Sequence, residues 1–157
     1  MINASSEQIR GLTGCVSTAT VGIGGTAAKC RLTAPNGAGV DFAIDGLGYH
    51  LADTDDFWTM SGDTVADDSE CLFLLCVNAS GTMSIEQGTA ILTADLDSGK
   101  KVLPWPQPDA DVCPLGAVRV TTDGAAYIPG TTDLDASTVT DTYYNFLLGM
   151  PAAPLTS

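Results

Sequence analysis

The middle of the chain reads Cys71-Leu72-Phe73-Leu74-Leu75-Cys76-Val77, then Asn78-Ala79-Ser80-Gly81, then Thr82-Met83-Ser84-Ile85-Glu86-Gln87. Seven consecutive apolar residues are typical of a β-strand covered on both faces, and the alternation in residues 82–87 is typical of a strand covered on one face. In the joining segment, Asn78 can hydrogen-bond its own backbone and Gly81 can adopt a positive φ, which favours a type I turn with a glycine bulge. The pattern predicts a central β-hairpin.

A second hairpin is predicted at Asp45-Gly46, because this dipeptide favours a two-residue type I′ turn. The register that follows places six apolar side chains on one face: Val40, Phe42, Ile44, Leu47, Tyr49 and Leu51. On the other face it sets Asp41 opposite His50, the only histidine of the chain. We interpret this pair as a surface ion pair and not as a general base, because the sequence provides no nucleophile or second acid beside it.

Further strands follow from the same signals. Asp123-Gly124 predicts a third hairpin that pairs Val120 with Tyr127 and leaves Arg119 on the opposite face. Shorter strands are expected at residues 29–34, 57–60 and 89–93. Residues 138–148 combine helical spacing of aromatic residues with Thr and Val, and we choose a strand there.

Residues 1–28 differ from the rest of the chain. They hold only a thin scatter of apolar residues between glycines, too few to build a core. The cluster Gly22-x-Gly24-Gly25 lacks the spacing of a phosphate-binding loop and indicates flexible backbone. We therefore expect an extended N-terminal arm over residues 1–28 and a single β domain over residues 29–157. The predicted fold is all-β, an antiparallel β-sandwich or open barrel.

The segment Pro104-Trp105-Pro106-Gln107-Pro108 is expected to be a stiff, extended connector. Alternating prolines prevent regular ladder pairing and favour a polyproline-like path. Trp105 is expected to pack against the sheet or against a neighbouring subunit.

The composition limits the classes of partner. The 157 residues include 6 Lys and Arg against 19 Asp and Glu, a formal charge of -13. Nucleic-acid binders draw most of their affinity from basic residues, so a nucleic-acid partner is not expected. No apolar stretch approaches the length that spans a bilayer, and no signal-peptide pattern opens the chain, so no membrane partner is expected either.

The sequence predicts no metal or cofactor. The five cysteines, Cys15, Cys30, Cys71, Cys76 and Cys113, show no C-x-x-C spacing and fit buried free thiols. The segment Asp95-Leu96-Asp97-Ser98-Gly99 comes closest to a calcium loop, but its glycine arrives one residue early. An enzyme would need paired carboxylates such as Asp53 with Asp55 or Asp67 with Glu70, and these lie in polar segments where both acids should be ionised. No catalytic residue is predicted.

Three segments together carry a resemblance to a known group of proteins. They are residues 42–49 (Phe-Ala-Ile-Asp-Gly-Leu-Gly-Tyr), residues 71–82 around the central turn, and residues 114–134 with Pro129-Gly130-Thr131-Thr132. Over residues 40–148 the chain resembles small virion structural proteins of tailed bacteriophages. The resemblance implies a decoration (cement) protein on the outer capsid surface, assembled in the host cytoplasm. Its partners would be the major capsid protein and further copies of itself, with a trimer favoured.

The docking contacts of such a protein are expected at the apolar residues of the arm and at aromatic residues of the domain, namely Ile9, Leu12, Val16, Trp105 and Tyr144. The arm would add contact area on the capsid. The alternative is a head or tail fibre module that recognises host-surface glycan through exposed aromatic residues such as Trp58, Trp105 and Tyr144.

Overall fold

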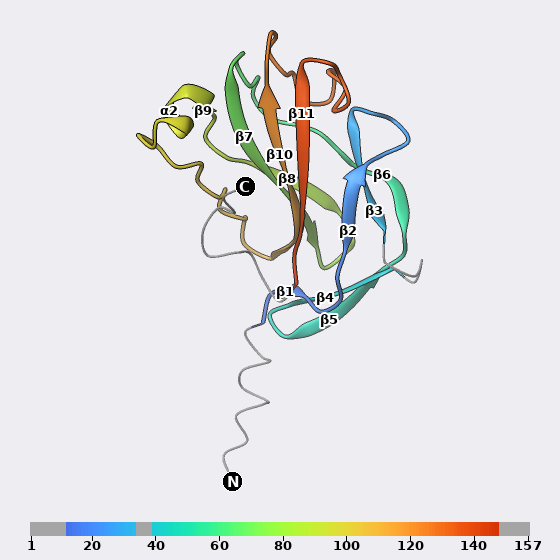
Figure 1. Cartoon of the computed structure of the whole chain (residues 1–157). Helices are drawn as coiled ribbons and strands as arrows, with labels where there is room; N and C mark the ends of the chain where they lie inside the picture. The colour runs from blue at the N-terminus through green and yellow to red at the C-terminus, as the bar shows by residue number, and fades with distance from the viewer. Residues whose placement is uncertain (1–11, 34–38, 148–157) are drawn as a thin grey trace.

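The computed structural model describes residues 12–33 and 39–147, and these form an all-β fold of three antiparallel sheets (Figure 1). The strands are β1 (Gly14–Cys15), β2 (Thr20–Ile23), β3 (Lys29–Thr33), β4 (Val40–Ile44), β5 (Leu47–Leu51), β6 (Thr54–Thr59), β7 (Ser69–Asn78), β8 (Met83–Gln87), β9 (Ile91–Leu92), β10 (Val112–Thr122) and β11 (Val139–Asn145). One short helix, α2, spans Thr93–Asp97. The predicted antiparallel all-β class is confirmed, and the arrangement is that of a sandwich.

The central hairpin is confirmed, but the one-sided burial expected for residues 82–87 is not, since Met83 is 37% exposed. β7 lies inside the five-stranded sheet, whose order is β11-β10-β7-β8 with β9 also pairing β7. Every residue of β7 except Asn78 is buried, as expected for a strand covered on both faces. In the turn, the Asn78 side-chain oxygen accepts hydrogen bonds from the backbone N–H groups of Ser80 (3.0 Å) and Thr82 (2.9 Å). Gly81 has a φ of 78°, which is the conformation the turn needs.

The other two sheets have three strands each. Their orders are β2-β3-β6 and β1-β4-β5. The Asp45-Gly46 hairpin has the predicted register, with Ile44 opposite Leu47, Phe42 opposite Tyr49 and Asp41 opposite His50. Both turn residues have positive φ, 51° at Asp45 and 78° at Gly46, as a type I′ turn requires.

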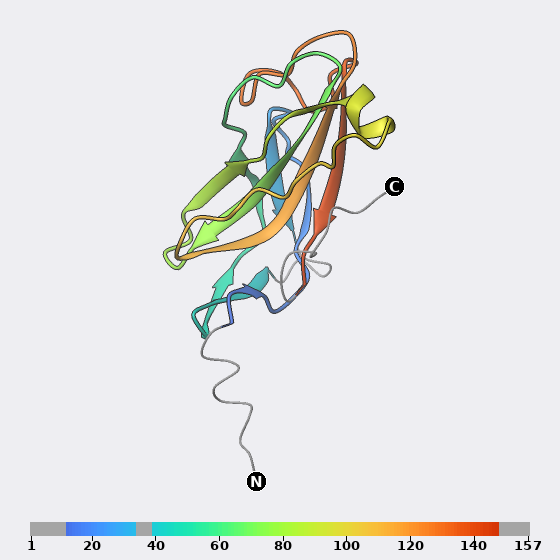
Figure 2. The same cartoon turned by 90° about the vertical axis from the view of Figure 1, so that its left-hand side faces the viewer.

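The core lies between the five-stranded sheet and the two smaller sheets. In Figure 1, β2, β3 and β6 stand beside the large sheet, while β4 and β5 cross its lower end. Trp58 of β6 is fully buried, and its indole N–H donates to the Cys76 carbonyl oxygen of β7 at 2.9 Å. Figure 2 shows that the connection from α2 to β10 runs over the opposite, outer face of the large sheet. The large sheet is therefore covered on both sides.

The expected boundary of the arm at residue 28 is wrong. β1 pairs with β4 and β2 pairs with β3, so residues 14–23 belong to the sheets. Cys15, Ala19 and Val21 are buried in the shared core. A thin apolar pattern can build core structure when the partner surface comes from elsewhere in the chain, and that information is not local. The rest of the expected arm, residues 1–11, lies outside the described residues.

The predicted hairpin at Asp123-Gly124 is also wrong. β10 pairs with β7 on one edge and with β11 on the other, which leaves no edge for residues 125–129. The chain turns at Gly124 (φ 90°) into a loop, and the backbone of Tyr127 pairs instead with Val65 in an isolated bridge. Tyr127 is fully buried there.

Four remaining strand predictions have mixed outcomes. The strand expected at residues 57–60 overlaps β6, which spans Thr54–Thr59. The strand chosen within residues 138–148 is confirmed as β11, and the strand expected at residues 29–34 is β3, Lys29–Thr33. The strand expected at residues 89–93 is shortened to β9, because the chain enters α2 at Thr93. Within the described ranges, no helix combines the length and the apolar character needed to cross a bilayer.

The glycine cluster near residue 24 has a local structural role. The Asp56 carboxylate accepts hydrogen bonds from the Thr26 backbone N–H (2.8 Å) and the Thr26 hydroxyl, and Asp55 accepts one from the Gly25 N–H (3.0 Å). A Cβ at Gly24 would lie 2.4 Å from an Asp56 carboxylate oxygen. Only glycine allows the β2–β3 loop to wrap around these two aspartates so closely.

The hydrogen bonds between Asp56 and Thr26 predict that the stability of the fold depends on pH. Hydrogen bonding to Thr26 holds the pKa of Asp56 below its ordinary value of 3.8. The stabilisation is therefore complete above pH 3.8 and is lost as the pH falls through the lower pKa of the folded state. We expect Asp56→Asn to be less stable than the wild type near neutral pH, with a difference that shrinks in acid. Thermal unfolding from pH 7 to pH 2.5 measures it, with Asp97→Asn as the control. A difference that is constant across this range would contradict the assignment.

Candidate functional site

Two of the predicted interface residues, Trp105 and Tyr144, meet on the outer face of the large sheet. Their ring centroids are 5.8 Å apart with an interplanar angle of 78°, an edge-to-face contact. Trp105 makes a second such contact with the buried Phe146, at 5.6 Å. We call Trp105 and Tyr144 the Trp105 patch.

The patch residues are positioned by strand pairing and by the proline connector. Tyr144 of β11 lies opposite Ala117 of β10, on the face that points away from Cys30 and Trp58. The connector has no regular secondary structure, as predicted, and its Leu103 and Pro106 are buried. Trp105 between them is half-buried, and its indole N–H has no hydrogen-bond partner among the residues described. The connector thus leaves the tryptophan side chain partly exposed, with its indole nitrogen buried and unpaired among the described residues.

A buried ion pair lies on the same face of the sheet. Arg119 of β10 donates from Nε to the Glu70 carboxylate of β7 at 2.6 Å, and its Nη2 contacts the same oxygen. The side chain of Glu70 is only 5% exposed and that of Arg119 is 25% exposed. Burial alone would lower the pKa of the Arg119 guanidinium, but hydrogen bonding to Tyr144 and Glu70 raises it above its ordinary value. Arg119 therefore stays charged and connects Glu70 to the patch.

The other predicted interface residues do not join this patch. Leu12 is half-buried, and Val16 is 52% exposed beside β1, on the small β1-β4-β5 sheet. Ile9 lies outside the described residues. Trp58, named for the glycan-binding alternative, is fully buried, so it cannot stack on a sugar. A single aromatic strand looks the same in sequence whether its tryptophan points to the core or to solvent.

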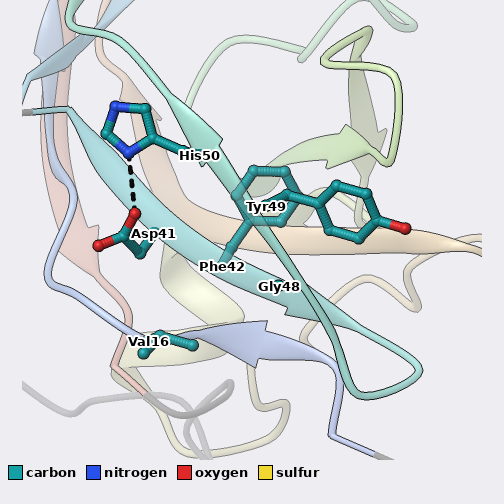
Figure 3. Close-up of a pocket in the computed structure, with 6 residues that line it drawn as sticks. All are labelled: Val16, Asp41, Phe42, Gly48, Tyr49 and His50. Carbon is teal, nitrogen blue, oxygen red and sulfur yellow. Dashed lines mark hydrogen bonds and ion pairs between the residues drawn. The ribbon is translucent and has the colours of Figure 1, made fainter.

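A shallow depression lies on the small sheet, lined by Val16, Asp41, Phe42, Gly48, Tyr49 and His50 (Figure 3). The predicted pair is present: His50 Nδ1 is 2.8 Å from an Asp41 carboxylate oxygen. Both side chains are more than half exposed, 55% for His50 and 61% for Asp41, so the pair is an exposed contact worth less than about 1 kcal/mol. On the opposite, core-side face of this sheet, the Phe42 and Tyr49 rings stack with centroids 5.5 Å apart.

The carboxylates of Asp55, Asp67 and Glu70, which were considered for catalysis, bind other groups. Glu70 is held by Arg119, while Asp67 uses its carboxylate to cap the backbone N–H of Asp68. Asp55 binds the glycine loop. Among the described residues, no group of three or more His, Cys, Asp or Glu side chains is arranged to hold a metal ion.

The five cysteines are buried free thiols, as predicted. Burial raises the pKa of Cys30 and Cys76 to about 12 and that of Cys71 to about 11. Thiols with these pKa values are almost entirely protonated near neutral pH, so they behave as apolar core groups.

The chain was compared with known proteins at the levels of family, sequence and structure. No family model, curated protein or solved structure matches it. The functional argument therefore depends on the chain's own residues.

Sequence reasoning did not find the ion pair beneath the patch. The sequence pattern places Glu70 in a polar segment with Asp67, and it places Arg119 on the opposite face of a hairpin that does not form. One sequence signal could have found the pair. Glu70 and Arg119 each lie in a long apolar segment, and a buried charged side chain needs a partner of opposite charge.

Proposed function

We propose that this protein is a structural component of a tailed-phage virion, a decoration protein that binds the outer capsid surface as a homo-oligomer and bridges capsid subunits. The major capsid protein is its partner, and no reaction, cofactor or metal is part of the proposal. Attachment at several equivalent points would turn weak single contacts into stable binding.

The observation that carries the proposal is the Trp105 patch. Trp and Tyr, together with Arg, are the residues that most often dominate binding energy at protein interfaces. Here the Trp105 ring packs edge-to-face on Tyr144 and on the buried Phe146, so little side-chain entropy would be lost on docking. The resemblance of residues 40–148 to phage virion proteins supports the same conclusion.

The test is co-sedimentation with empty heads of the phage whose genome encodes the chain. We expect the wild-type protein to sediment with the heads and Trp105→Ala to bind at least about tenfold more weakly, the loss typical of a hot-spot residue. Leu92→Ala, which removes a side chain that is 51% exposed next to α2, is the matched control and should bind normally. Circular dichroism confirms folding of each variant. Equal binding by wild type and Trp105→Ala, or none by either, would contradict the proposal.

A glycan-recognising fibre module is the second candidate. It is favoured by one observation, the partly exposed Trp105 and Tyr144 rings, since sugars stack on such aromatic faces. Binding on a glycan array that Trp105→Ala abolishes, with no binding to heads, would favour this function over decoration.

A further inference from the structure

Two buried thiols meet where the small β1-β4-β5 sheet crosses the lower end of the five-stranded sheet (Figure 1). Cys15 belongs to β1 and Cys113 to β10, and both residues are fully buried. The Cys15 sulfur lies 3.9 Å from the Pro114 carbonyl oxygen, and the Cys113 sulfur lies 3.8 Å from the same oxygen. The two thiols are also in hydrogen-bond contact with each other. They therefore form a pair that joins two sheets.

The two strands approach each other more closely than packed sheets usually do. Cα atoms of β1 and β10 lie within 8 Å of each other, whereas the backbones of packed sheets are about 10 Å apart. A disulfide joins residues whose Cα atoms are about 4.4–6.8 Å apart. Little movement of β1 is therefore needed to bring Cys15 and Cys113 to bonding distance.

Cys76 is another thiol close to Cys113, but the strand register turns it away. β10 pairs with β7 so that Cys113 is opposite Val77 and Pro114 is opposite Cys76. Opposed residues share a face of the sheet and successive residues alternate between faces, so Cys113 and Cys76 point to opposite faces. Cys15, which contacts Cys113, is thus its partner.

We propose that Cys15 and Cys113 form a disulfide when the folded, reduced protein meets hydrogen peroxide, and that this link fixes the small sheet to the five-stranded sheet. Peroxide oxidises the Cys15 thiol to a sulfenic acid and releases one water. The Cys113 thiol then attacks the Cys15 sulfur, the S–O bond breaks, and a second water leaves as the S–S bond forms. In total the two thiols lose two electrons and two protons, and one hydrogen peroxide is reduced to two waters.

Cys15 is the thiol of the pair that peroxide reaches first. β1 has two residues and lies at the edge of its sheet, so it opens more readily than β10, which is paired on both edges. In the closed structure, contact with Cys113 and burial raise the pKa of the Cys15 thiol, which keeps it unreactive. Opening of β1 removes both causes, and reclosure returns the oxidised sulfur to Cys113.

The test uses the full-length protein and needs no capsid, because the inference does not depend on the proposed function. Reduced protein is treated with hydrogen peroxide, denatured, alkylated and mapped by mass spectrometry. We expect two of the five thiols to escape alkylation and the peptides of Cys15 and Cys113 to be joined within one chain. The melting temperature should rise by at least about 5 °C and fall back on reduction, since the link closes a loop of roughly 100 residues.

Alanine variants of single cysteines assign the link. Cys15→Ala and Cys113→Ala should each prevent both the link and the rise in melting temperature, while Cys76→Ala, the matched control, should retain both. Circular dichroism of the reduced variants confirms folding, and if a variant does not fold, the wild-type peptide map decides the question. Alkylation of all five thiols after peroxide treatment, conversion of Cys15 to a sulfinic acid without a link, or a disulfide that uses another pair or joins two copies would each overturn the inference.

Discussion

Replacing Arg119 with alanine lowers the free energy of unfolding by about 3 kcal/mol or more, because it leaves the Glu70 carboxylate buried without its counter-charge. Glu70 is 5% exposed and its oxygen Oε2 is bound by two nitrogens of Arg119, so water cannot replace them without opening the sheet. Urea denaturation followed by tryptophan fluorescence measures the loss at neutral pH.

The double variant Glu70→Leu/Arg119→Met separates the charge effect from packing. Replacing a buried ion pair by apolar residues of similar volume is often neutral or stabilising, so this variant should recover most of the stability that Arg119→Ala loses. If the double variant is as unstable as Arg119→Ala, packing around the aliphatic stem of Arg119, and not the unpaired carboxylate, determines the cost.

Replacing Trp58 with alanine is expected to cost about 4 kcal/mol, in the range for deletion of a large buried aromatic side chain. Trp58 is fully buried and links two sheets, since it belongs to β6 and donates to the Cys76 carbonyl of β7. Trp58→Phe keeps most of the volume and loses the hydrogen bond, so it should cost about 1–3 kcal/mol. Urea denaturation measures both losses in the free energy of unfolding.

Trp105→Ala is the comparison for this prediction. Trp105 is only half-buried and its indole N–H is unpaired among the described residues, so its removal should cost clearly less stability than removal of Trp58. A larger loss at Trp105 than at Trp58 would mean that the connector, and not the junction between sheets, holds the core together.

Two identical dipeptides show how far the sequence predicts this fold. Asp45-Gly46 and Asp123-Gly124 carry the same turn signal, and only the first closes a two-residue hairpin. Apolar residues alternate with other residues on both sides of Asp45-Gly46. One edge of β4 is also available to pair with β5. The strand before Asp123 is instead paired on both edges, by β7 and by β11, which is a property of the whole sheet that no local pattern contains.

The candidate site also has parts that the sequence could predict and parts that it could not. The sequence suggests Trp105 and Tyr144 as interface residues, because large aromatic residues often anchor protein contacts. Their contact with each other could not, because the two residues belong to segments that only the sheet brings together. The Glu70–Arg119 pair depends on the register of β7 against β10, which the wrong hairpin assignment obscured.

The hydrogen bond from the Val21 N–H to the Asn145 side chain, at 2.8 Å, joins residues 124 positions apart. During synthesis, β2 can pair with β3 early, but its contact with Asn145 forms only after almost the whole chain has left the ribosome, and the apolar β7 emerges much earlier than that. Folds dominated by such distant pairings form slowly, and their nascent chains are prone to aggregate. Production of this protein in a cell should accordingly depend on chaperones that shield nascent polypeptides.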